Sequence, residues 1–210
     1  MAESRDYRTP QEQFWAGEFG AAYMNRNQGD ALLTSNVHFF SQALRTAGAV
    51  TSCLEFGANI GMNLKALRTL HPGMTAQAVE INPEAARVLA DLVGPENVHC
   101  GSLLDYEAAR LFDLTLVKGV LIHIGPDALP VAYDRLYRAS ARLILVAEYY
   151  NPTPVSVPYR GHSDRLLKRD FAGKMLDRYS NLRLRDYGFV YRRDPHFPQD
   201  DVTWFLLEKH

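Results

Sequence analysis

A strand-like stretch that runs into two spaced glycines is the first feature that could do chemistry. Residues 52–56 are followed by Gly57 and Gly61, and the pattern after Gly61 is helical. Glycines between a strand and a helix let the backbone pass close to a bound nucleotide or nucleoside. Ala58 and Asn59 stand where a G-x-G-x-x-G dinucleotide loop has its second glycine. The stretch therefore predicts a cradle for a nucleoside-containing cofactor, and the alternative is a tight turn without a ligand.

Two acids follow the next apolar stretches. Glu80 lies at the carboxyl end of the stretch 76–81, and a carboxylate there can accept hydrogen bonds from both hydroxyls of a ribose. NAD sites use the same contact, so Glu80 indicates a ribose without distinguishing between cofactors. Asp105 follows the third stretch and is either a ligand or the N-cap of a helix over 106–111.

His123 is the candidate proton-transfer group. It follows a fourth apolar stretch, which ends with Lys118, Gly119 and Val120. An imidazole titrates near neutral pH, so His123 suits a general base. A hydrogen-bond donor to the substrate and a packing residue are the alternatives.

A basic, proline-rich loop is predicted over residues 149–169. Its polar and aromatic candidates are Tyr149, Tyr159, Arg160, His162, Arg165, Lys168 and Arg169. Asp164 is the only acid between 159 and 169. Arginine side chains can bind an anionic ligand through two parallel hydrogen bonds, so the loop is expected to hold an anionic ligand. The alternative is a surface loop whose charged groups face water.

These residues are positioned by an alternation of strands and helices. Strands are predicted at 52–56, 76–81, 98–101, 114–118 and 143–148, with helices at 61–70, 83–93, 126–137 and 168–179. Pro83 and Pro126 suit first helical turns, with Asn82 and Gly125 at the caps. Repeated strand–helix units imply a parallel sheet with helices on both faces.

The two ends of the chain depart from that alternation. The strands 182–191 and 202–209 have no helix between them, so they should pair antiparallel as a hairpin at the edge of the sheet. Residues 9–48 are predicted to form helices before the sheet.

Composition narrows the functional class. The chain has 210 residues, 47% of them hydrophobic, and a formal net charge of -1, which fits one α/β domain spanning 1–210. No strong electrostatic attraction to nucleic acid or to a membrane is expected.

Cys53 and Cys100 are expected to be buried thiols, and the histidines lack metal-ligand spacing, so no metal is expected. A polar N-terminus without a signal sequence favours a cytoplasmic location. No sequence feature specifies an oligomeric state.

Several motifs together resemble a known family. They read FWAGEFGAAYMNRN, LEFGANIGMNL, KGVLIHI and EYYNP…YRGH…KRDF. The closing hairpin and the spacing of Glu55 and the glycines resemble class I S-adenosylmethionine-dependent methyltransferases. The fuller set resembles the pseudaminic-acid-biosynthesis-associated methyltransferases and the phosphonate O-methyltransferase of dehydrophos biosynthesis.

The resemblance implies a Rossmann-like fold with a seven-stranded, mostly parallel sheet, an antiparallel C-terminal hairpin and an N-terminal helical lid over 1–48. It implies S-adenosylmethionine as methyl donor, with S-adenosylhomocysteine as product, and a small anionic acceptor. The implied cofactor residues are Tyr23, Arg26, Phe56, Gly57, Ala58, Asn59, Gly61, Asn63, Leu64, Glu80, Ile81, Ser102, Leu103, Lys118, Gly119 and Val120. Arg26 would bind the methionine carboxylate, and Ser102 and Leu103 would line the adenine pocket. The N-terminal helix could instead only pack its aromatic residues onto the core.

The implied acceptor residues are Tyr23, Tyr149, Tyr159, Arg160, His162 and Lys168, in the lid and the 149–169 substrate loop. An oxygen acceptor such as a phosphonate or an acidic sugar is favoured, and the alternative is N-methylation of a small amine, with Glu148, Tyr149 and Tyr150 near the methyl group. A nucleic-acid methyltransferase is disfavoured because KGVLIHI replaces the usual N/D-P-P-Y/F motif. A non-catalytic cofactor-binding protein is disfavoured by the basic loop.

Overall fold

The structure is built around one seven-stranded sheet. The computed structural model describes residues 7–24, 26–159 and 162–210, without the side chains of 159 and 162–165. The strand order is β3-β2-β1-β4-β5-β9-β8. The strands are β1 Ser52–Phe56, β2 Thr75–Glu80, β3 Val98–Cys100, β4 Phe112–Lys118, β5 Ser140–Glu148, β8 Leu182–Val190 and β9 Val202–Lys209.

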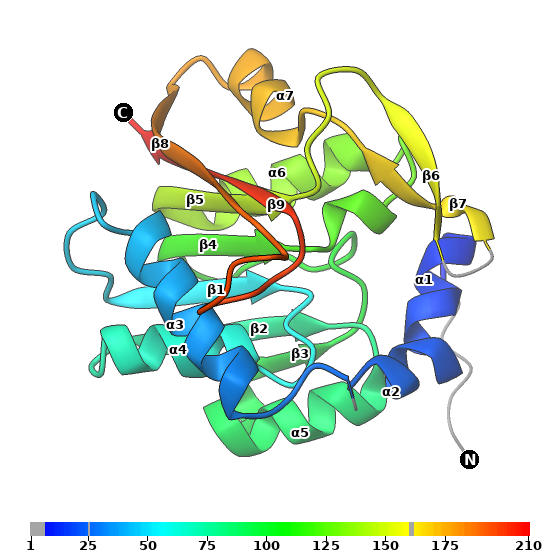
Figure 1. Cartoon of the computed structure of the whole chain (residues 1–210), viewed down its shortest axis with the longest axis horizontal. Helices are drawn as coiled ribbons and strands as arrows, with labels where there is room; N and C mark the ends of the chain where they lie inside the picture. The colour runs from blue at the N-terminus through cyan, green and yellow to red at the C-terminus, as the bar shows by residue number, and fades with distance from the viewer. Residues whose placement is uncertain (1–6, 25, 160–161) are drawn as a thin grey trace.

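Strand direction decides where a ligand can bind. Strand β1 pairs in parallel with β2 and β4, and β5 continues the parallel set beside β4. Strand β9 runs antiparallel between β5 and β8, as predicted for the terminal hairpin. The carboxyl ends of the parallel strands therefore meet at one edge, the right-hand edge in Figure 1. Open α/β sheets bind their ligands at this edge.

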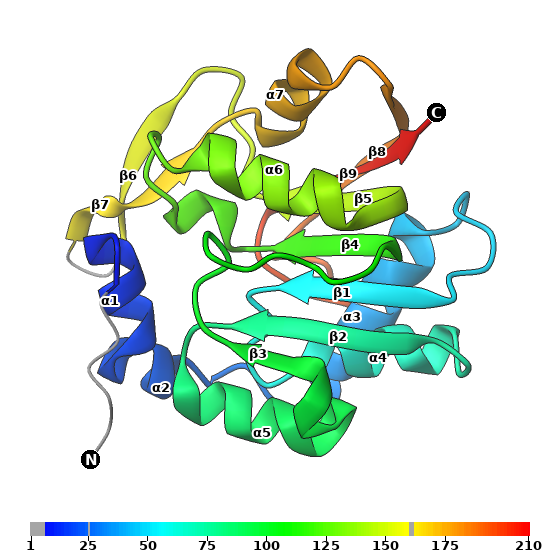
Figure 2. The same cartoon turned by 180° about the vertical axis from the view of Figure 1, so that it is seen from behind.

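Helices cover both faces of the sheet. The helices are α1 Pro10–Ala16, α2 Glu18–Met24, α3 Asp30–Ala43, α4 Met62–Leu70, α5 Pro83–Val93, α6 Leu129–Ala139 and α7 Phe171–Arg178. Buried side chains of α3, α4 and α5 form one core layer with the sheet, and those of α6 and α7 form the other. Helices α1 and α2 instead lie beyond the carboxyl ends of the strands, as both views show (Figures 1 and 2).

The predicted substrate loop contains a second, two-stranded sheet. Strands β6 (Val155–Tyr159) and β7 (His162–Lys168) pair antiparallel, so the prediction of a loop throughout 149–169 was wrong. Val157 and Leu166 face each other across this pair and both pack into the α6–α7 core layer. Burial of one face stabilises a hairpin that the prolines obscure in the sequence.

Three other local predictions were wrong. Helix α6 begins at Leu129, with Pro130 in its first turn, rather than at Pro126. Helix α7 begins at Phe171 because Asp170 accepts a hydrogen bond from the Gly173 amide. The possible helix over 106–111 does not form, and Asp105 instead pairs with Arg8.

The two cysteines differ in environment. Both are free thiols, but Cys53 is buried and Cys100 is only half-buried, because β3 is a short edge strand. In the part of the chain that the structure describes, no helix has the length and apolar character needed to cross a lipid bilayer.

Candidate functional site

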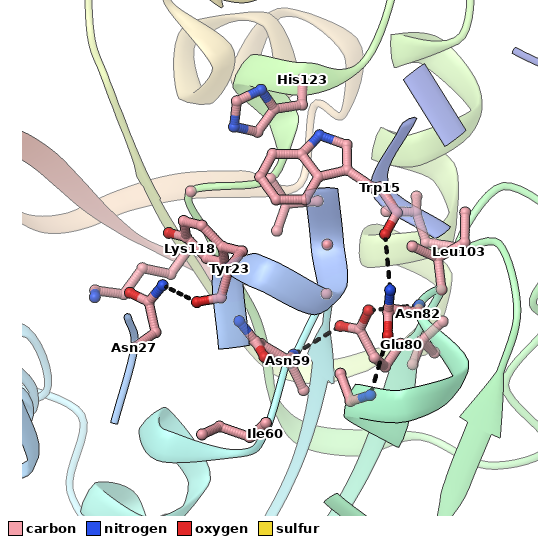
Figure 3. Close-up of a pocket in the computed structure, with 18 of the residues that line it drawn as sticks. Trp15, Tyr23, Asn27, Asn59, Ile60, Glu80, Asn82, Leu103, Lys118 and His123 are labelled. Carbon is pink, nitrogen blue, oxygen red and sulfur yellow. Dashed lines mark hydrogen bonds between the residues drawn. The ribbon is translucent and has the colours of Figure 1, made fainter. Parts of the chain in front are cut away.

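A cavity lies where the carboxyl ends of the parallel strands meet α1 and α2. Its walls come from the loops after β1, β2, β3 and β4 on one side and from the N-terminal helices on the other (Figure 3). The wall that follows the strands is here called the sheet side, and the wall from α1 and α2 is called the helix side.

The glycine loop forms the floor of the sheet side. Gly57 has φ 76° and Asn59 has φ 49°, both in the left-handed region. A Cβ at Gly57 would lie 2.5 Å from Val120 Cγ2, so a side chain there would collide with the loop after β4. Gly61 has a different role, because a Cβ there would meet Leu92 of α5 at 2.7 Å, outside the cavity wall.

Glu80 organises the neighbouring backbone. One carboxylate oxygen accepts a hydrogen bond from the Asn59 amide at 2.7 Å, and the other accepts one from the Asn82 amide at 2.7 Å. The side chain is 7% exposed, and burial raises the pKa of its carboxyl. Each oxygen keeps a further lone pair, so the group can still accept hydrogen bonds from a pair of ligand hydroxyls.

Asn82 joins the two sides. Its Oδ1 caps α5 by accepting hydrogen bonds from the amides of Glu84 and Ala85, both at 3.1 Å. Its Nδ2 donates toward the carbonyl oxygens at the end of α1, at 3.3 Å to Trp15, 3.3 Å to Ala16 and 3.2 Å to Gly17. The sequence predicted only the cap.

A second contact joins α1 to the loop after β3. Glu12 closes a capping box with Thr9, and Ser102 donates a hydrogen bond to the Glu12 carboxylate. Glu12 and Ser102 are each only 9% exposed. The hydroxyl predicted to meet an adenine therefore has a protein partner in this structure.

A buried polar group lies behind the far end of the cavity. Asn63 donates a hydrogen bond to Glu55 Oε1 at 2.7 Å, and Glu55 is fully buried. Burial raises the pKa of Glu55 to about 8, an effect that the Asn63 hydrogen bond and the Lys118 charge oppose. Burial also lowers the pKa of Lys118, whose ammonium lies 3.5 Å from Asn36 Oδ1. Among the described residues, Lys118 is the only Lys or Arg lining the cavity.

An aromatic group forms the opposite end. The Trp15 ring lies 4.6 Å from the His123 ring and 5.3 Å from the Tyr23 ring, between centroids. His123 belongs to η2 (Leu121–His123), a short 3-10 turn after β4, and is 9% exposed. Figure 3 shows these three rings together at the cavity, above Asn59 and Glu80.

Most of the predicted cofactor residues line the cavity. They are Tyr23, Gly57, Ala58, Asn59, Asn63, Glu80, Ile81, Ser102, Leu103, Lys118, Gly119 and Val120, together with the candidate base His123.

Four predicted cofactor residues lie outside the cavity wall. Phe56 and Leu64 are buried in the core, and Gly61 packs against α5. Arg26 is exposed, with its guanidinium 5.7 Å from the Phe19 ring centroid and 5.6 Å from that of Tyr23. Arg26 therefore lies against the rings of α2 and not in the cavity wall that its position in the sequence suggested.

Of the predicted acceptor residues of 149–169, Tyr149 and Lys168 have described side chains, and neither lies in the wall. Tyr149 packs against the core layers, and the Lys168 ammonium lies 5.3 Å from its ring centroid. Arg160 and the side chains of Tyr159 and His162 lie outside the described residues. Strand β7 packs against η2, which contains His123, so the hairpin lies beside the aromatic end of the cavity.

Sequence reasoning missed several cavity residues. Those carrying polar or aromatic groups are Thr9, Gln11, Glu12, Trp15, Asn27, Asn36 and Asn82. All except Asn82 belong to the segment before β1, where helical periodicity marks a buried face without showing what it faces. The T-P-Q-E capping box around Glu12 was the one readable signal.

Comparison with known proteins gives the fold. No protein-family model matches the chain, and no curated protein matches its sequence, so the narrower resemblance to the pseudaminic-acid and phosphonate enzymes stays a prediction.

Solved structures match with high coverage and low identity. The 1,6-didemethyltoxoflavin-N1-methyltransferase of Burkholderia thailandensis, solved with bound 1,6-didemethyltoxoflavin and S-adenosylhomocysteine, has a TM-score of 0.70 and 18% identity, over 98% of this chain and 92% of that one. Magnesium protoporphyrin IX methyltransferase from Synechocystis PCC 6803, solved with S-adenosylmethionine, has a TM-score of 0.66 and 11% identity, over 98% and 100%.

Mitomycin 7-O-methyltransferase has a TM-score of 0.66 and 16% identity over 96% of this chain, which spans only 61% of that protein. At these low identities the comparison concerns the fold alone, and the seven-stranded sheet with its antiparallel C-terminal hairpin agrees with the fold that the sequence predicted. The chain therefore has the Rossmann-like class I methyltransferase fold.

Proposed function

We propose that this chain is an S-adenosylmethionine-dependent methyltransferase that acts on a small molecule. The observation that carries the proposal is the cavity at the carboxyl ends of the strands, where Gly57–Asn59, Glu80 and Lys118 converge. Structures with the same fold bind S-adenosylmethionine or S-adenosylhomocysteine.

The cavity residues suit the parts of such a cofactor. Glu80 would accept the ribose hydroxyls, and Ser102 and Leu103 would contact the adenine. The Gly57–Asn59 backbone would pass along the methionine part. Because Arg26 lies outside the wall, Lys118 is the cation that would meet the methionine carboxylate.

Methyl transfer mainly requires that the acceptor be positioned against the methyl group. S-adenosylmethionine supplies an electrophilic methyl group whose leaving group departs neutral, so no acid is needed to assist departure. The chain must hold an acceptor in line with the S–CH₃ bond, and such positioning can supply on the order of 7 kcal/mol of barrier lowering. Trp15, Tyr23 and His123 border the space in which the acceptor would lie.

We favour oxygen methylation of a small anionic metabolite, such as a phosphonate or an acidic sugar. His162, Arg165 and Lys168 belong to strand β7, which packs against η2 near the aromatic end of the cavity. A phosphonate or carboxylate oxygen is anionic near neutral pH and needs no base, whereas a sugar hydroxyl would require His123 to take its proton.

N-methylation of a small amine is the second candidate. The observation in its favour is the pair of rings at Trp15 and Tyr23, because aromatic faces attract cationic groups.

A panel of phosphonates, nonulosonic acids and amines tests both candidates through release of S-adenosylhomocysteine. Turnover with an anionic acceptor supports the first candidate, and turnover with amines alone would replace it by the second. No turnover by a chain that binds the cofactor tightly, across a broad acceptor panel, would argue for a binding protein.

The role of His123 is tested by His123→Ala. As a general base it should contribute about 10²-fold to kcat. A loss below about tenfold would assign His123 to hydrogen bonding or packing instead.

A further inference from the structure

Glu148 is a buried carboxylate at the carboxyl end of β5, outside the cavity wall. It is 2% exposed, and its Oε1 accepts hydrogen bonds from the backbone amides of Val120 and Leu121, both at 2.9 Å. These two amides open the turn that ends at His123.

The turn does not satisfy those amides by itself. Its own backbone bonds run from the His123 amide to the Val120 carbonyl at 2.9 Å and from the Ile124 amide to the Leu121 carbonyl at 3.1 Å. The first amides of any helical turn lack partners within it, and a buried amide without a partner costs about 1–3 kcal/mol. Glu148 therefore anchors the start of η2 to the neighbouring strand.

Charged and polar groups from three elements surround this carboxylate. Burial raises the pKa of Glu148 to about 7. The hydrogen bonds from the backbone amides and the positive charge of Lys118 on β4 act in the opposite direction and lower it. Tyr133 of α6 interacts electrostatically with Glu148, Arg169 and Asp170. Glu148 Oε2, the Tyr133 hydroxyl and Arg169 Nε are all buried without a hydrogen-bond partner among the described residues.

We propose that Glu148 is a positioning residue that orients His123 by holding the Val120 and Leu121 amides. The proposal rests on the proposed function, in which His123 borders the acceptor. Glu148 does not line the cavity, so its hydrogen bonds reach the reaction only through the turn.

A double-mutant cycle tests this relation in the full-length protein. E148A removes both acceptor contacts and should lower kcat about 30-fold, with S-adenosylhomocysteine affinity unchanged within about threefold. E148Q keeps a carbonyl acceptor and should stay within about fivefold of the wild-type kcat. When E148A is added to H123A, kcat should fall by less than about a further threefold. An equal loss from E148A with and without His123, or E148Q as impaired as E148A, would overturn the proposal.

A readout that needs no acceptor separates this proposal from the proposed function. In ¹⁵N-histidine-labelled protein, assigned with H123A, the ring signals of His123 should move or broaden in E148A and stay near wild type in E148Q. E107A, which removes an exposed acid paired with Arg135, is the control and should leave them unchanged.

Ring signals in E148A that superimpose on the wild type would overturn the proposal. If E148A does not fold, E148D replaces it, because aspartate is one methylene shorter than glutamate. Ring signals of His123 in E148D that superimpose on the wild type would then overturn the proposal. A chain with the expected signal changes but no turnover would retain the positioning role and lose only the proposed function.

Discussion

The sheet side and the helix side of the cavity are held in place by different forces. The sheet side consists of backbone continuous with the sheet: the Gly57 amide donates to the Val79 carbonyl at 2.8 Å, and the Gly119 amide donates to the Ala147 carbonyl at 2.9 Å. The helix side is held by side chains, through Asn82 against the end of α1 and through the contact of Glu12 with Ser102.

The difference has a consequence for stability. Helices α1 and α2 have 7 residues each, below the length at which an isolated helix is stable in water. Their order therefore depends on those side-chain contacts, whereas the sheet side shares the stability of the core. We expect changes on the sheet side to weaken cofactor binding and changes on the helix side to loosen the cover over the cavity.

The largest effect is expected from Gly57→Ala. The added methyl would lie 2.5 Å from Val120 Cγ2 and would occupy a left-handed backbone position. The affinity for S-adenosylhomocysteine, measured by calorimetry, should fall about 100-fold or more, or about 2.7 kcal/mol.

Gly48→Ala is the matched control, because Gly48 has φ 70° and nothing within 4 Å of the added Cβ. An alanine at position 48 has the same left-handed backbone cost of about 1–2 kcal/mol, but its methyl group collides with nothing. The cofactor affinity of this variant should therefore be unchanged. Equal losses of affinity in both variants would show that the Gly57 loop does not form the cradle.

A smaller loss is expected from Glu80→Gln. Glutamine has one acceptor oxygen in place of two, so it cannot keep the Asn59 and Asn82 amides and also accept two ribose hydroxyls. The affinity for S-adenosylhomocysteine should fall about 10- to 50-fold. Glu84→Gln, on an exposed first turn of α5, should have no effect. Unchanged affinity in Glu80→Gln would remove the ribose assignment.

Asn82→Asp tests the helix side. Aspartate keeps the Oδ1 cap of α5 but loses the Nδ2 donor and places a carboxylate beside the carbonyl oxygens of Trp15, Ala16 and Gly17. Hydrogen exchange in residues 9–24 should accelerate about tenfold, while cofactor affinity falls less than about fivefold. Exchange at the wild-type rate would mean that other contacts hold α1 in place.

The smallest effect concerns the pH dependence of stability. Burial raises the pKa of Glu55 from 4.5 to about 8, so between these values the folded chain keeps a proton that the unfolded chain has released. The free energy of unfolding of the cofactor-free protein should therefore fall as pH rises through that window.

Glu55→Gln should make this slope less steep in denaturant unfolding at several pH values. The contributions of Glu80 and Glu148, whose pKa values are also raised by burial, remain in the variant. An identical slope in the variant would show that Glu55 is ionised in the folded chain.

The same contrast explains what the sequence could predict. Strand periodicity, the glycine spacing and the acid at Glu80 predicted the parallel sheet with its antiparallel hairpin and most of the sheet side, because those features arise from local pattern and strand direction.

The helix side depends on contacts between distant segments, such as Asn82 with α1, and no local pattern encodes them. Arg26 is an example: its position near Tyr23 in the sequence suggested the cavity, but its exposed guanidinium lies over the Phe19 and Tyr23 rings and outside the cavity wall. The hairpin β6–β7 was missed because the burial of Val157 and Leu166 outweighs the prolines around them.

Calorimetric titration of the wild-type chain with S-adenosylhomocysteine, and separately with NAD, tests the central claim most directly. The cavity geometry predicts binding of S-adenosylhomocysteine at one site per chain with a dissociation constant below about 100 µM, or about -5.5 kcal/mol, and no comparable binding of NAD. Binding of NAD without binding of S-adenosylhomocysteine would contradict the account.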